Sequence, residues 1–114
     1  MSKADDLQER TDAFADRSIK LVQGLPETPI ARRLGGQYQD CSTSVAANYR
    51  AARRGRSHAE FTSKMGIVSE EADESVFWLK RMVNADIRSS EPIEPLLAEA
   101  ERAGAYLRRI PSNR

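Results

Sequence analysis

The stretch from residue 57 to residue 86 reads SHAEFTSKMGIVSEEADESVFWLKRMVNAD, and it decides the fold class. It opens with a capping box, in which the Ser57 hydroxyl can accept from the amide of Glu60 while the Glu60 carboxylate reaches back. Apolar and small residues then recur at steps of three and four, which places their side chains on one face of a helix. That face consists of Phe61, Met65, Val68, Ala72, Ser75, Leu79, Val83 and Asp86. The stretch therefore predicts a long amphipathic helix that ends at residues 88–90.

Three further segments share this helical spacing, and they predict helices over residues 5–23, 29–54 and 90–110. Gly24, Pro26 and Gly55 separate the first three helices, and Pro111 ends the last one. Alternating β-branched runs, which would indicate strands, do not occur. Short connections place consecutive helices antiparallel. We therefore predict an all-α fold, an antiparallel up-down four-helix bundle, built as a single domain over residues 1–114.

Composition limits the classes of function. The chain is 39% hydrophobic and 31% charged with a formal net charge of +1, so binding of nucleic acid would need a local patch. The single cysteine, Cys41, cannot form an internal disulfide, which is typical of a reducing compartment. We find neither a signal peptide nor an apolar run approaching the ~20 residues of a membrane span. We therefore expect a cytoplasmic protein that has no membrane partner.

Basic residues are concentrated where the second predicted helix meets the third. They are Arg50, Arg53, Arg54, Arg56 and Lys64. Guanidinium groups bind phosphate and carboxylate well because they offer a bidentate fork. One prediction is a binding patch for RNA, DNA or a nucleic-acid enzyme at one pole of the bundle. The alternative, which stays open, is a solvated surface or pairing with acidic residues of a neighbouring helix.

Large apolar residues on the third helix fall outside its main stripe. At about 100° per residue, Ile67, Phe77 and Trp78 point away from Ala72 at the centre of the stripe. Exposed aromatic surface marks interaction sites, and aromatic residues are enriched in them. We therefore predict an oligomer interface at these three residues. A core face wide enough to absorb them is the alternative.

Polar residues flank the stripe of the second helix. Gln37, Ser44 and Asn48 share one side of it, and residues 42–47 between them are almost all small. Buried polar groups need hydrogen-bond partners. We therefore predict a satisfied structural network at these three positions rather than a ligand site.

No catalytic constellation emerges from the sequence. His58 is the only histidine and has no partner at ligand spacing. The acidic run 70–74 lacks the Glu-x-x-His pairs of di-iron bundles and reads as a solvated helix face. Cys41 lies on a core stripe, where an inert thiol is expected. We predict that the protein is not an enzyme, has no catalytic or metal-binding residues and uses no cofactor.

Several motifs resemble those of a known family. They are Gln37-Tyr38, STSVAANYR at residues 42–50, Arg53-Arg54, Ser57, Phe61, Lys64, EADES at residues 71–75 and Trp78-Leu79. With them the chain resembles the bacterial four-helix bundle proteins. These include proteins encoded in intervening sequences of large-subunit ribosomal RNA genes, and the accessory protein of diversity-generating retroelements is related to them.

The resemblance implies a cytoplasmic, non-enzymatic bundle that assembles into a ring-like homopentamer. The retroelement relatives bind a reverse transcriptase and nucleic acid through a basic surface. In this chain Asp40 stands where members often carry arginine, which reduces the basic character. Two functions are expected on this basis: a scaffold or adaptor for a macromolecular partner with weak nucleic-acid binding, or a purely structural homo-oligomer that binds no nucleic acid.

Overall fold

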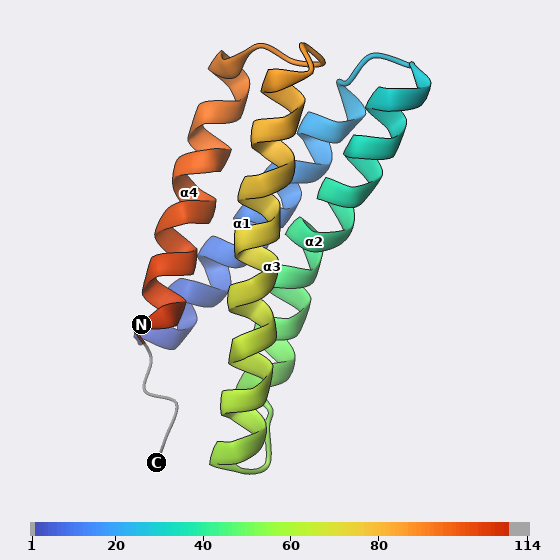
Figure 1. Cartoon of the computed structure of the whole chain (residues 1–114). Coiled ribbons are helices and arrows are strands. Elements are labelled where there is room, and N and C mark those ends of the chain that lie inside the picture. Colours follow the sequence, from blue (N-terminus) through green and yellow to red (C-terminus); the bar gives the residue numbers. More distant parts are fainter. Residues whose placement is uncertain (1, 110–114) are drawn as a thin grey trace.

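Four helices make up the described part of the chain. The computed structural model describes residues 2–109, apart from the side chain of residue 106. The helices are α1 (Lys3–Gln23), α2 (Pro29–Arg53), α3 (His58–Asn84) and α4 (Ser90–Arg108). They run alternately up and down, and the described residues contain no strand (Figure 1). The predicted antiparallel four-helix bundle is therefore confirmed, while the predicted helix end at Pro111 lies outside the described residues.

Side-chain caps fix where three of the helices begin. Ser2, Thr28 and Ser57 accept hydrogen bonds from amides in the first turns of α1, α2 and α3, at 3.1, 3.2 and 3.0 Å. Each such cap contributes about 1 kcal/mol to helix stability. The predicted capping box at α3 forms only in part, because the Glu60 carboxylate accepts from the amide of Arg56 at 3.1 Å.

The end of α3 comes earlier than the sequence predicts. The chain turns at Asp86, whose φ of 58° lies in the left-handed region. The amide of Ile87 then donates to the carbonyl of Met82, and that of Asp86 to Val83, both at 3.0 Å. This pattern is a Schellman motif, in which an apolar residue folds back over the last turn. Asp86 therefore does not extend the apolar face, and the buried Ile87 closes the core at this pole.

The core consists of two clusters stacked along the bundle. The cluster nearer the α2–α3 turn contains Leu7, Val45, Tyr49, Ala52, Met65, Val68, Ala72 and Leu107. The cluster toward the other pole contains Phe14, Leu21, Tyr38, Leu79, Met82, Ile93, Leu96 and Ala100. The hydroxyls of Ser18 and Tyr38 lie 2.6 Å apart, and both residues are fully buried. This hydrogen bond satisfies two polar groups that would otherwise destabilise the interior.

A glycine inside α2 has a packing reason. A Cβ at Gly35 would lie 2.9 Å from Cδ1 of Leu25 and 3.5 Å from Cγ1 of Val22, so the absence of a side chain leaves room for these two side chains at the end of α1 and just after it. The neighbouring Gly36 has no heavy atom within 4 Å of such a Cβ, and packing does not explain it.

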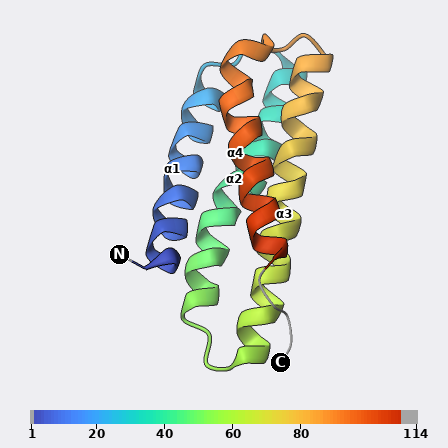
Figure 2. The same cartoon turned by 90° about the vertical axis from the view of Figure 1, so that its left-hand side faces the viewer.

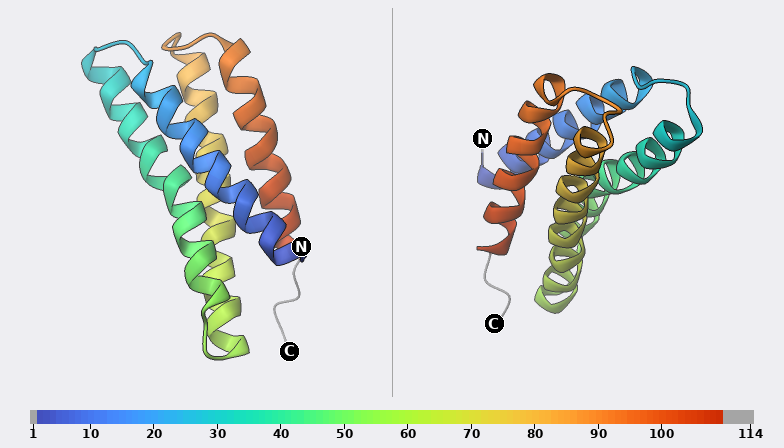
Figure 3. Two further views of the ribbon diagram at one scale, coloured as in Figure 1. Left: turned by 180° about the vertical axis from the view of Figure 1, so that it is seen from behind. Right: turned by 45° about the horizontal axis from the view of Figure 1, so that its top comes forward.

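The helices follow one another around the bundle in chain order. Each helix packs against its two neighbours, and α1 and α4 make the least extensive contact of the four helix pairs. Figure 2 shows α4 in front of α2, with α1 and α3 on either side. From behind, α1 lies between α2 and α4 (Figure 3). The α2–α3 seam and the α1–α4 seam are therefore on opposite sides of the molecule.

Candidate macromolecule-binding surfaces

The hairpin of α2 and α3 extends beyond the ends of α1 and α4 (Figures 1 and 2). The α2–α3 connection and the adjoining turns of both helices carry the five predicted basic residues. They are Arg50, Arg53, Arg54, Arg56 and Lys64, and together we call them the basic tip. The four arginines are exposed, and Lys64 is half-buried. Arg54 and Arg56 therefore lie at the end of the hairpin, while Arg50 and Arg53 lie beside α1.

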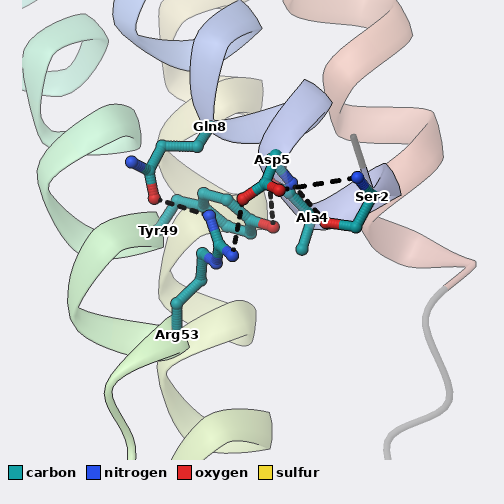
Figure 4. Close-up of polar contacts among 6 residues, drawn as sticks. All are labelled: Ser2, Ala4, Asp5, Gln8, Tyr49 and Arg53. Carbon is teal, nitrogen blue, oxygen red and sulfur yellow. Dashed lines mark hydrogen bonds and ion pairs between the residues drawn. The ribbon is translucent and has the colours of Figure 1, made fainter.

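Two of these arginines pair with carboxylates of α1 in the same chain. Nη2 of Arg50 lies 2.6 Å from Oδ2 of Asp12. Nη2 of Arg53 lies 3.0 Å from Oδ1 of Asp5, and its Nη1 donates to Oε1 of Gln8 at 2.9 Å (Figure 4). Pairing with a neighbouring helix, which the sequence left as an alternative, thus accounts for Arg50 and Arg53.

The contacts around Arg53 fasten the start of α1 to α2. The Tyr49 hydroxyl donates to the carbonyl of Ala4 at 3.1 Å, beside the bond from Arg53 to Asp5 (Figure 4). Hydrogen bonds from Arg53 and Ser2 hold the pKa of Asp5 below its usual value. A carboxyl with a lowered folded-state pKa stabilises the fold above its unfolded-state pKa, and this contribution is lost as the pH falls through the folded-state value. The pair is exposed, so its contribution is small.

The remaining cations of the basic tip have no such partners. Within residues 2–109, the side chains of Arg54, Arg56 and Lys64 form no ion pair. Arg56 is exposed, and only its backbone amide is bonded to Glu60. These three side chains are the ones that can contact a polyanion without first breaking a bond within the chain.

The polar flank of α2 differs from its predicted form. Asn48 donates from Nδ2 to Oε1 of Glu71 at 2.9 Å, and Ser44 also hydrogen-bonds to this carboxylate. Gln37 is exposed and takes no part, so the prediction of a network among Gln37, Ser44 and Asn48 is wrong in its membership. Glu71, which the sequence predicts on a solvated face, is half-buried instead, and its carboxylate is the common partner of Asn48 and Ser44. Burial raises its pKa, against the opposing effect of the bond from Asn48.

Replacing Asn48 with leucine should destabilise the fold by about 1–3 kcal/mol, because Glu71 would lose its amide donor. Thermal and urea denaturation would measure the loss. In a Glu71→Leu background the same replacement should cost much less, since both polar partners are then gone. An equal cost in the two backgrounds would contradict the pairing.

The raised pKa of Glu71 also predicts how the stability of the fold depends on pH. A carboxyl with a raised folded-state pKa favours the fold below its unfolded-state pKa, and this benefit is lost as the pH rises through the folded-state value. Glu71→Gln keeps the oxygen that accepts from Asn48 and removes the charge. It should therefore slightly raise the melting temperature at neutral pH, where Glu71 is ionised. It should leave the melting temperature unchanged below about pH 4, where Glu71 is already protonated. A uniform shift at both pH values would show that ionisation of Glu71 is not the cause.

A groove lies along the seam between α2 and α3. It has a volume of about 400 Å³ and is lined by Gln37, Asp40, Cys41, Ser44, Glu71, Glu74, Phe77 and Trp78. We call it the acidic–aromatic groove. The Phe77 ring contacts Trp78 edge-on at a centroid distance of 4.9 Å, and the Arg81 guanidinium carbon lies 4.8 Å from the Phe77 centroid.

The three predicted interface residues differ in exposure. Phe77 is 48% and Ile67 is 42% exposed, as the helical wheel indicates. Trp78 is half-buried and packs against the core cluster, so the prediction that it points outward is wrong. The reason is that the core face of α3 is wide enough near Trp78 to hold its indole, and the part of the indole that stays accessible lines the groove.

The Cys41 thiol is free and buried. Burial raises the pKa of the Cys41 thiol, which accepts a hydrogen bond from Ser75 at 3.4 Å. Residues 2–109 contain no group of three or more metal-ligating side chains. None of the four described helices combines the length and apolarity that a bilayer crossing requires.

The fold and its surfaces define the protein as a compact antiparallel four-helix bundle. The chain belongs to the 23S rRNA-intervening sequence protein family, whose model matches residues 5–109. The resemblance given by the sequence motifs is thereby confirmed. A protein of unknown function from the S23 ribosomal protein family of Bacteroides thetaiotaomicron has a similar crystal structure. Its TM-score is 0.83 at 25% sequence identity, and the match covers 89% of this chain and 94% of that one. No curated protein matches the sequence.

Proposed function

We propose that the protein is a non-enzymatic, cytoplasmic homo-oligomer that acts as a scaffold or adaptor and binds RNA or DNA weakly through its basic tip. The observation that carries the proposal is the position of Arg54, Arg56 and Lys64. Arg54 is the C-cap of α2, Arg56 lies in the α2–α3 connection and Lys64 lies near the start of α3, and they form no ion pair within the described residues. Side chains of this kind can bind phosphates without desolvating an existing pair.

Assembly would strengthen this binding. One tip supplies few phosphate contacts, but several tips in one particle engage the same strand at a high effective concentration. The exposed Phe77 and Ile67 on α3 support self-association, because exposed apolar patches of this type are typical of interfaces. The family resemblance suggests a pentamer.

The test is fluorescence anisotropy with a labelled single-stranded RNA. Arg54→Glu/Arg56→Glu should weaken binding at least about 10-fold at low salt and flatten the dependence of affinity on salt, because fewer counterions are released. Arg32→Glu/Arg33→Glu is the matched control, since it makes the same charge change on exposed residues at the opposite end of α2. Affinity should depend little on base sequence, because phosphate contacts carry no sequence information.

Two results would contradict the proposal. The first is an equal loss of affinity in the control, which would make the effect one of net charge. The second is no binding at low salt by a wild-type oligomer. That outcome would leave the purely structural homo-oligomer, which the pairing of Arg50 and Arg53 with α1 favours.

A further inference from the structure

A second groove lies on the seam between α1 and α4. It has a volume of about 320 Å³, and three cations surround an apolar floor. Arg17 and Lys20 come from α1, and Arg88 comes from the α3–α4 connection. The floor is formed by Leu21, Pro92, Pro95 and Leu96. No carboxylate belongs to this lining within the described residues, and we call the site the basic groove.

The acidic–aromatic groove has the opposite character. Asp40, Glu71 and Glu74 line it, and of these Asp40 and Glu74 are exposed. Phe77 presents a half-exposed ring at its edge, and Arg81 beside that ring is the nearby cation. One groove thus offers carboxylates and an aromatic ring, and the other offers cations and an apolar floor.

The two grooves lie on opposite seams of the bundle, because α2–α3 and α1–α4 are opposite sides. The basic groove lies near the α3–α4 connection, at the pole away from the basic tip, and the acidic–aromatic groove lies along the middle of the α2–α3 seam. We propose that they are the two halves of one contact between copies of this chain: Phe77 of one copy packs on the Pro92–Leu96 floor of the next, and Asp40 and Glu74 face Arg17 and Arg88. The proposal rests on the homo-oligomer of the proposed function and names the surfaces that join it.

Charge favours this head-to-tail arrangement over a two-fold one. A two-fold contact through either groove would set like charges against each other, which opposes association. The head-to-tail contact instead pairs opposite charges. Contacts of this type produce rings when the rotation between copies closes.

The arrangement also has a consequence for the basic tip. Copies joined side by side through these seams share one direction along the bundle. Every hairpin therefore points to the same end of a ring, and the tips gather there. This is the geometry that lets several weak sites act on one strand.

Charge reversal tests the contact. Asp40→Lys/Glu74→Lys reverses the acidic–aromatic groove, and Arg17→Glu/Arg88→Glu reverses the basic groove. All four residues are exposed, so the variants should keep their helix content. Each variant alone should associate at least about 100-fold more weakly and give the mass of one chain by light scattering. Combining all four substitutions in one chain should restore assembly, because the two reversed grooves then match each other at every contact, whatever the number of copies in the ring.

Glu70→Lys/Glu101→Lys and Arg32→Glu/Arg33→Glu are the matched controls, since they make the same charge changes on exposed residues that line neither groove. Both should keep the wild-type mass. Variants that stay assembled when one groove alone is reversed, or a four-substitution variant that stays dissociated, would overturn this contact. If the basic-groove variant kept its mass but lost RNA affinity, that groove would be a nucleic-acid surface instead, which also overturns the contact. A monomeric wild-type chain would overturn the homo-oligomer of the proposed function itself, so the two failures are distinguishable.

Discussion

Leu79→Ala is expected to lower the free energy of unfolding by about 2–5 kcal/mol. Leu79 is fully buried in the core cluster that also contains Tyr38, Met82 and Ile93. Truncation removes apolar contacts and leaves a cavity that rigid helices fill only in part. A domain of this size is stabilised by about 5–15 kcal/mol in total, so the loss is a large fraction. Urea denaturation followed by circular dichroism would measure it, at several protein concentrations because assembly contributes to stability.

Phe77→Ala is the matched control on the same helix. It removes more atoms than Leu79→Ala does, but its ring is 48% exposed. Its effect on the fold should be no more than about 0.5 kcal/mol when assembly is absent. A larger loss from Phe77→Ala than from Leu79→Ala would show that the inner and outer faces of α3 have been exchanged.

The same Phe77→Ala change is expected to have its large effect on association. Aromatic residues at the centre of an interface cost about 2 kcal/mol or more when truncated. That cost corresponds to a dissociation constant raised by about 30-fold or more. Sedimentation velocity over a range of concentrations would detect the shift toward a single chain.

Ile30→Ala provides the comparison for association. Ile30 is 53% exposed in the first turn of α2, outside both grooves, and its loss should leave the assembly unchanged. Ile67→Ala should weaken assembly less than Phe77→Ala, because Ile67 lies outside the groove lining and carries no aromatic ring. If Ile30→Ala and Phe77→Ala weakened association equally, association would depend on general surface hydrophobicity.

Local sequence signals were sufficient for the helices themselves. The three-and-four spacing after Ser57 predicts α3 because burial on one face requires that period. Caps and breakers predict the helix ends to within a few residues. The largest miss came at Asp86, where periodicity continues in the sequence although the chain has already turned. A left-handed aspartate is hard to predict, since glycine usually takes that position.

Contacts between helices were less predictable. The partners of Arg50 and Arg53 lie 38 and 48 positions away, so no spacing rule indicates them. The inward turn of Glu71 depends on Asn48 of another helix, and a helical wheel does not show how wide the buried arc is. The same limit led to the wrong orientation for Trp78. The basic groove joins Arg17 and Lys20 to Arg88, and only the closed bundle brings them together.

The most direct test of the account is sedimentation velocity of a labelled single-stranded RNA mixed with the wild-type protein at low salt. We predict that the RNA sediments with a particle of several chains, about five times the 12.8 kDa chain mass for a pentamer. At about 200 mM salt the RNA should return to its free rate while the protein particle persists, because phosphate contacts release counterions. RNA that sediments alone at low salt, or together with a single chain, would contradict the account.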